Sequence, residues 1–295
     1  MTQYGLSEVR FFYIPVQARE PRPADGKTNV SIGTIDMPID VTLGFRAGRE
    51  AAKHNVYFSV DQQAVIDGTV PATTVTKASY GPLSLDLSKT YYWRVDEVNE
   101  TKTPTTWQGD LWDFTTQEYF IVDDFESYND IDTIYPESNR IFNVWLDGYG
   151  ITANGSIVGY ENPPFAEQTI VHGGRQSMPL AYSNTDGAAY SEAERNFTIG
   201  QNWTKAGGQT LVLFFYGTAG NTGQLYVKIN GSKVVYNGDA GDIAKTQWKQ
   251  WNIALPSLGL NLRNVTKLGI GIDGNNASGK LYFDDIRLYR LAPVP

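Results

Sequence analysis

The sequence predicts an all-β chain of two sandwich domains, a small one over residues 20–117 and a larger jelly roll over residues 118–295. Three observations predict this class. Short runs alternate apolar and polar residues, as half-buried strands do, and no segment keeps the 3.6-residue apolar period of a helix. Aromatic residues, which favour strands, make up 13% of the chain. The 29 Gly and 14 Pro provide the turns that many short strands require.

The first segment, residues 1–19, is predicted to be the last strand of a preceding domain that this fragment does not include. Residues 9–14 have strong β propensity, Pro15 ends the run, and residues 20–26 form a predicted Pro/Gly linker. The stretch "YGLSEVRFFYIP" resembles the final strand of a discoidin-type galactose-binding-like domain. The alternative is an extra edge strand of the next domain, and the pattern leaves both open.

Residues 20–117 contain short strand-like runs at the spacing of a small β-sandwich, namely 41–45, 54–60, 83–87, 90–98 and 112–116. The segments "FRAGREAAKHNVYFSVD", "KTYYWRVDEVNE" and "WQGDLWDFTT" resemble the fibronectin type III-like modules of large secreted planctomycete and related bacterial proteins. The resemblance implies an immunoglobulin/fibronectin III-like sandwich that acts as a spacer and has no catalytic residues. Tyr91 and Trp93 are then expected to be core and sheet aromatics.

Residues 118–295 contain longer strand-like runs. Residues 210–216 are apolar on both faces, as in a central strand, and Asn230-Gly231 marks a hairpin within residues 224–236. Further alternating runs cover residues 248–255, 268–273 and 281–289. Long strands with two distinct faces favour a jelly-roll sandwich.

The sharpest chemical feature is an acidic cluster with no basic residue inside it: Asp123, Asp124, Glu126, Asp130 and Asp132. On the last predicted strand, Asp284 shares a face with apolar residues, and a buried unpaired carboxylate is costly. Ca²⁺, which takes 6–8 oxygen ligands, would offset that cost. The first and last strands of a jelly roll can be adjacent, so Glu126 and Asp284 could share one ion, with backbone carbonyls near residues 174–177. The alternative is a solvated acidic turn, with Asp284 paired to Arg140 or Arg175.

A second resemblance covers residues 120–290. The segments "VDDFESYND", "HGGRQSMPLAY", "WKQWNIAL" and "GKLYFDDIRLYR" resemble jelly-roll carbohydrate-binding modules that open with an Asp-Phe-Glu strand and close with an Asp-Asp-Ile strand. The resemblance implies a structural Ca²⁺ held by the opening Glu126 and the closing Asp284. With the neighbouring Asp124, these residues are the candidate metal ligands.

Sugar recognition needs aromatic rings that stack on C–H faces and polar groups that bind hydroxyls, usually in a concave site. The candidates off the apparent core face are Trp145, Asp147, Tyr149, Tyr190, Tyr226, Lys228, Asn230, Asp273 and Asn275. The best single candidate is Trp145-Leu-Asp-Gly-Tyr, in a Gly/Asn-rich loop. The alternative is that Trp145 plugs one end of the sandwich.

Composition excludes several other classes. The chain has no Cys and only 2 His, so thiolate and multi-His metal sites are impossible. A net charge of −8 argues against a nucleic-acid partner. No apolar run reaches the roughly 18 residues of a membrane span. No carboxylate pair faces across inner strands in an obvious way, and no nucleophile elbow or phosphate loop occurs. A lyase-type set of Gln168, His172 and Arg175 is present, but His172 lies in a segment that resembles a structural turn.

The sequence therefore predicts a non-enzymatic protein whose calcium-stabilised jelly roll binds polysaccharide or glycan, with the first domain as a spacer. We expect an exported bacterial protein, extracellular or at the cell surface, whose signal peptide and neighbouring domains lie outside this fragment. The competing prediction is a structural or adhesive module of an extracellular assembly. A sugar module would expose one to three aromatic rings in a groove, whereas an assembly module would expose a broader apolar patch.

Overall fold

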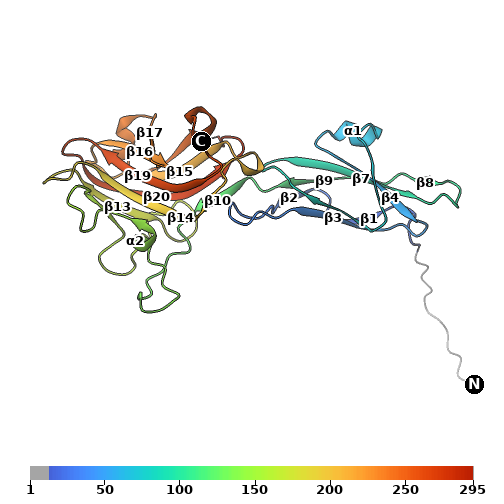
Figure 1. Ribbon diagram of the computed structural model, residues 1–295, viewed down its shortest axis with the longest axis horizontal. Helices are drawn as coiled ribbons and strands as arrows, with labels where there is room; N and C mark the ends of the chain where they lie inside the picture. The colour runs from blue at the N-terminus through green and yellow to red at the C-terminus, as the bar shows by residue number, and fades with distance from the viewer. Residues whose placement is uncertain (1–12, 295) are drawn as a thin grey trace, which may run out of the picture. The chain divides into compact units, whose positions relative to one another are not determined.

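The computed structural model describes residues 13–294, and it confirms the predicted all-β class (Figure 1). The chain divides into two compact units. The first comprises the described part of Met1–Ile32 with Ile39–Leu85 and Lys89–Gln117, and the second comprises Gly33–Pro38, Asp86–Ser88 and the described part of Glu118–Pro295. No helix within residues 13–294 is long and apolar enough to cross a membrane.

The predicted strand near the N-terminus falls mostly on residues 1–12, outside the described part. The stretch expected as a linker begins instead with a strand, β1 (Arg19–Arg22), which pairs with β3 (Val41–Arg46) of the first unit. Residues of β1 alternate between half-buried and exposed, as in a strand at the edge of a sheet.

The first unit packs a three-stranded sheet, β1-β3-β6, and a six-stranded sheet, β2-β9-β7-β4-β5 with β8 paired to β7. Its remaining elements are β2 (Lys27–Val30), β4 (Lys53–Ser59), α1 (Gln62–Asp67), β5 (Thr73–Val75), β6 (Ser79–Leu83), β7 (Thr90–Val98), β8 (Thr106–Trp107) and β9 (Leu111–Thr116). Tyr91 and Trp93 are buried as expected, and Trp93 packs edge-on against Trp112 with ring centroids 4.7 Å apart. Tyr91 and Trp93 of β7 therefore belong to the core of this unit.

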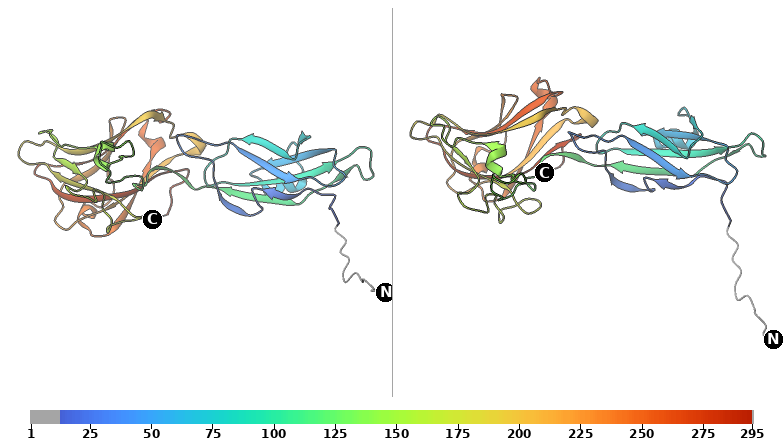
Figure 2. Two further views of the ribbon diagram at one scale, coloured as in Figure 1. Left: turned by 90° about the horizontal axis from the view of Figure 1, so that it is seen from below. Right: turned by 60° about the horizontal axis from the view of Figure 1, so that its bottom comes forward.

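The second unit has two antiparallel sheets (Figures 1 and 2). The six-stranded sheet has the order β12-β13-β20-β15-β18, with β10 paired to β20, and the five-stranded sheet has the order β11-β14-β19-β16-β17. Its strands are β10 (Tyr119–Asp123), β11 (Trp145–Leu146), β12 (Ser156–Val158), β13 (Met178–Ser183), β14 (Ser191–Gln201), β15 (Thr210–Tyr216), β16 (Gln224–Ile229), β17 (Ser232–Val235), β18 (Trp248–Ala254), β19 (Val265–Asp273) and β20 (Ser278–Tyr289). Short helices add α2 (Ile141–Val144), η1 (Lys205–Gly207), η2 (Ala240–Ala244) and η3 (Leu255–Leu258).

Several local predictions for this unit are confirmed. The first strand β10 runs antiparallel to the last strand β20, and β15 lies between β20 and β18. The hairpin turn falls on Asn230-Gly231, both at positive φ, which suits the twist of the flanking strands. The long connections between β10 and β13 gather around α2, green in Figures 1 and 2. These connections carry most of the site described below.

Candidate functional site

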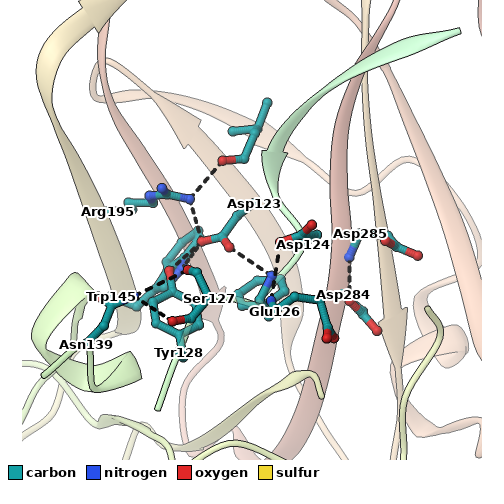
Figure 3. Close-up of polar contacts among 12 residues, drawn as sticks. Asp123, Asp124, Glu126, Ser127, Tyr128, Asn139, Trp145, Arg195, Asp284 and Asp285 are labelled. Atoms are coloured by element: carbon teal, nitrogen blue, oxygen red, sulfur yellow. Dashed lines mark hydrogen bonds and ion pairs between the residues drawn. The ribbon is translucent and has the colours of Figure 1, made fainter. Parts of the chain in front are cut away.

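Asp123, the first acid of the predicted acidic cluster, is the buried acceptor for side chains from three other segments of the unit (Figure 3). Its carboxylate, 5% exposed, accepts hydrogen bonds from Tyr128 Oη at 2.6 Å and Trp145 Nε1 at 2.8 Å. Arg195 Nη1 lies 2.5 Å from the same oxygen. Three donors from separate segments therefore satisfy one buried carboxylate, which is the condition under which burial of such a charge is tolerated.

The other acids of the cluster also accept hydrogen bonds from turns. Asp124 accepts from the Glu126 backbone N–H, and Asp130 accepts from the Phe165 backbone N–H at 2.8 Å. Asp132 pairs with Arg140 at 3.3 Å. The long connections of this unit leave backbone N–H groups without strand partners, and short acidic side chains supply the acceptors.

Glu126 and Asp284 lie against one turn, as the calcium hypothesis requires. Asp284, fully buried, accepts from the backbone N–H groups of His172 at 2.8 Å and Gly173 at 3.1 Å. Glu126 accepts from the N–H groups of Arg175 and Gln176 at 2.7 and 3.0 Å. The turn therefore offers N–H donors to the carboxylates where the sequence suggested carbonyl ligands.

The donor set fits a calcium ion only in part. Burial raises the pKa of Asp284 to about 6, although the N–H donors oppose that shift, so its charge is costly as predicted. No group of three or more His, Cys, Asp or Glu side chains within residues 13–294 converges as a metal site. The arginines suggested as partners of Asp284 pair instead with Asp132 and Glu126. The N–H contacts of Asp124 and Glu126 use one oxygen of each carboxylate, Oδ1 and Oε1.

The lyase-type residues are not gathered at one site. His172 Nδ1 lies 2.6 Å from Asp285, and its ring stacks on Phe214 at 3.7 Å. Gln168 and Arg175 line a different hollow, together with Glu126.

The prediction that Trp145 stacks on sugar is wrong. Its side chain is 0% exposed, and its ring packs on Phe125 with centroids 6.0 Å apart. The indole N–H is used by Asp123. Trp145 is therefore a core residue, as the alternative of a plugged sandwich end supposed.

Four other candidates meet on the outer face of the five-stranded sheet: Tyr190, Tyr226, Lys228 and Asp273. Tyr226 is not an open platform, because its ring is 1% exposed and lies across Gly271. Lys233 covers that ring at 4.0 Å and pairs with Asp273 at 2.7 Å. The charges named here are thus already paired, and the Tyr226 ring is covered, whereas Tyr190 is half-buried.

Two residues of this face were missed. Glu192 pairs with Lys228 at 2.7 Å, and together with burial it raises the pKa of the Tyr226 phenol. Lys233 is the other. Both face Tyr226 only through strand register, which the sequence pattern does not supply. Asn275 and Asn230 lie in exposed turns, and Asn230 caps the backbone of residues 264–267.

The remaining candidates, Asp147 and Tyr149, line a cleft of about 740 Å³ beside α2. Its walls combine aromatic, aliphatic and polar side chains: Arg140, Phe142, Asn143, Asp147, Tyr149, Ile157, Val158, Tyr160, Glu161 and Phe165. Tyr149 is 86% exposed, whereas Phe142 and Tyr160 are half-buried. Of the residues that line the cleft, only Asp147 and Tyr149 were predicted as sugar contacts. The one sequence signal for the others is the number of aromatic residues between positions 142 and 165.

The cleft is held by hydrogen bonds within its own walls. Asp147 accepts from the N–H groups of Tyr149 at 2.8 Å and Val158 at 2.6 Å, which ties the loop after β11 to β12. The Tyr160 hydroxyl donates to Glu167. Burial raises the pKa of Glu167, but hydrogen bonds from Thr169 and Tyr160 outweigh it and lower that pKa to about 2. Asp147 and Glu167 therefore position the rings and the loop.

Three polar groups of the cleft remain free to meet a ligand. The side chains of Asn143 and Glu161 are exposed and make no hydrogen bond or ion pair within the described part of the chain, and the Tyr149 hydroxyl is likewise unengaged. A hollow of this size, mostly apolar with a few placed polar groups, is the usual form of a small-ligand site.

Comparison with known proteins found no matching family model and no match among curated proteins. Solved structures of similar fold include one described as carbohydrate-binding modules of the β-sandwich superfamily, at 12% identity and TM-score 0.36, covering 92% of this chain and 97% of that one. A family 11 carbohydrate-binding module from Clostridium thermocellum, solved with a β-1,3-1,4-mixed-linked tetrasaccharide, has 18% identity and TM-score 0.34, with 58% and 95% covered. A family 30 carbohydrate-binding module has 13% identity and TM-score 0.35, with 48% and 87% covered.

Proposed function

We propose that the second unit binds carbohydrate without catalysis, in the cleft beside α2. The observation that carries the proposal is the lining of that cleft, where Phe142, Tyr149 and Tyr160 present ring surface next to free polar side chains. Rings of this kind can cover the C–H faces of sugars, and the amide of Asn143 and the carboxylate of Glu161 can bind hydroxyls. Polysaccharide or glycan is therefore the proposed partner.

The outer face of the five-stranded sheet is the less favourable position. A ligand there would have to break the Glu192–Lys228 and Lys233–Asp273 pairs before it reached the Tyr226 ring. In the cleft, Tyr149 is open to solvent and needs no such rearrangement. We propose the first unit as a spacer and an extracellular or cell-surface location, both of which follow from the resemblance of its motifs.

Loss of cleft aromatics is expected to weaken glycan binding. We expect Tyr149→Ala and Phe142→Ala each to reduce affinity about tenfold, the size of one lost stacking contact. Tyr135→Ala is the matched control, because Tyr135 is also an exposed tyrosine, at 55%, and does not line the cleft. The measurement is a glycan array with insoluble-polysaccharide pull-down, followed by calorimetry on the binders.

The outcomes separate the two functional hypotheses. Binding that persists in both cleft variants would move the site to the Tyr190 and Tyr226 face. No binding to any glycan by folded protein would favour the structural or adhesive hypothesis, for which the exposed side chains of Leu146, Ile151 and Ile157 provide apolar surface.

Calcium stabilisation of this unit is a separate proposal, supported by the burial of Asp284 and by the single turn, residues 172–176, that both Asp284 and Glu126 contact. We expect Ca²⁺ at about 100 times its dissociation constant to add about 2.7 kcal/mol to the free energy of unfolding, or about 5–10 °C in midpoint. Thermal unfolding with Ca²⁺ and with chelator measures it. Glu126→Gln should abolish the difference, and Mg²⁺ is the control ion. Equal midpoints with Ca²⁺ and chelator would refute the proposal.

A further inference from the structure

The charged groups at the cleft leave it with excess negative charge. Arg140 is the one cation among its lining residues, and its Nη2 lies 3.3 Å from Asp132 outside the cleft. Both carboxylate oxygens of Asp147 accept hydrogen bonds from backbone N–H groups, so no cation is among these partners. Glu161 is exposed and has no ion-pair partner within residues 13–294.

The two charged groups that contact Tyr160 have opposite signs, so they do not change the net charge of the cleft. Lys280 lies over the Tyr160 ring with Nζ 5.0 Å from its centroid, and Glu167 accepts from its hydroxyl. One positive and one negative group therefore flank the same ring. The chain as a whole also carries a net charge of −8. Two carboxylates, those of Asp147 and Glu161, therefore line the cleft with one cation, Arg140, which is already paired with Asp132.

We propose that this cleft selects neutral glycans over glycans that carry carboxylate or sulfate groups, and that Glu161 is the residue that sets the selection; this inference rests on the proposed function of the cleft. A ligand carboxylate at contact distance from an exposed like charge loses about fivefold in affinity at low ionic strength. The same carboxylate of Glu161 accepts hydrogen bonds from the hydroxyls of a neutral sugar.

The Glu161 side chain can be replaced without loss of a contact that supports the cleft, so its charge can be tested separately. Its neighbour Tyr160 is fixed by a backbone hydrogen bond to the Phe165 carbonyl at 2.9 Å, and the Glu161 side chain contributes no contact to that arrangement. Asp147, in contrast, ties two segments of the wall together, so its removal would disturb the cleft itself. Glu161→Gln removes the charge with little change in shape.

The experiment uses one sugar backbone in three charge states. Gluco-, manno- and galacto-tetrasaccharides are screened against the full chain, and the tightest binder is then compared with its C6-oxidised carboxylate form and the methyl ester of that form. Calorimetry at low salt is expected to show the carboxylate form binding at least fivefold more weakly than the parent, with affinity restored in the ester. Near 1 M salt, where the screening length falls to about 3 Å, the gap should shrink.

Glu161→Gln is expected to reduce the difference in affinity between the parent tetrasaccharide and its carboxylate form. Asp110→Asn, which removes an exposed charge in the first unit, should leave that difference unchanged. Equal or tighter binding of the carboxylate form at low salt would overturn the inference, and so would a gap that Glu161→Gln does not change. If no tetrasaccharide binds, or if binding persists in Tyr149→Ala and Phe142→Ala, the proposed function of the cleft fails first and the inference fails with it.

Discussion

Replacing Trp145 by alanine is expected to lower the free energy of unfolding of the second unit by about 3–5 kcal/mol, the usual cost of removing a buried Trp side chain. The ring is fully buried against Phe125, so its loss leaves a cavity. The substitution also removes one hydrogen-bond donor from the buried carboxylate of Asp123. Both effects act on the same point of the core, which is why the expected loss is large.

Thermal unfolding of the full chain, with hydrogen exchange to assign the loss to residues 118–294, measures this effect. A loss of that size corresponds to a midpoint lower by about 6–20 °C in a unit of this length. Trp145→Phe retains most of the packing and removes the indole N–H, so it isolates the hydrogen bond to Asp123, with an expected cost of about 1–3 kcal/mol. Tyr149→Ala is the control from the same loop and should change stability by less than about 0.5 kcal/mol. An alanine variant as stable as the wild type would contradict the core assignment.

The sheets of both units were predictable because alternation directly reports which face of a strand is buried. On β16, Leu225, Val227 and Ile229 are buried on one face, as the pattern indicated. The partner of each strand was less accessible to sequence reasoning. The pairing of β10 with β20 could be predicted only from the jelly-roll topology, because the two strands are the first and the last of the unit in the sequence.

The sites were harder to predict because polarity in a sequence does not show what a side chain touches. The five clustered acids suggested a metal site. Asp123 instead accepts a hydrogen bond from the buried Trp145 indole, and Asp130 accepts one from the Phe165 backbone N–H. Tyr226 lies on the outer face as predicted, but its exposure depends on Gly271, which lets the ring lie flat. A Cβ at Gly271 would stand 2.4 Å from that ring.

The cleft illustrates the same limit. Phe142 and Phe165 meet edge-on at 5.1 Å, although an excursion through β11 and β12 separates them in the chain. Nothing in the local pattern of residues 130–168 predicts that its loops fold back on one another. The hydrogen bonds of Asp147 and Asp130 produce that arrangement, and they connect residues 11 and 35 positions apart.

The first unit has a counterpart of the Asp123 network in the pair Glu97 and His54, which face each other on β7 and β4. Glu97 is 0% exposed and His54 is 5% exposed. The Glu97 carboxylate contacts His54 Nδ1 and accepts from the Gly48 backbone N–H at 2.7 Å. Glu97→Ala removes the carboxylate that the buried Gly48 N–H and His54 Nδ1 both contact, and we expect it to destabilise this unit by about 3–5 kcal/mol.

Hydrogen exchange across β4 and β7 in the full chain isolates this effect from the second unit. Glu100→Ala is the matched control, because Glu100, two residues beyond the end of β7, pairs with Lys53 of β4 but its side chain is 73% exposed, so a loss below about 1 kcal/mol is expected. Replacing both partners by leucine tests the cause. If the loss arises from orphaned buried groups, the double variant should recover part of the stability, since the apolar pair leaves only the Gly48 backbone N–H without its acceptor. A Glu97→Ala loss no larger than that of Glu100→Ala would show that the buried pair does not anchor the sheet.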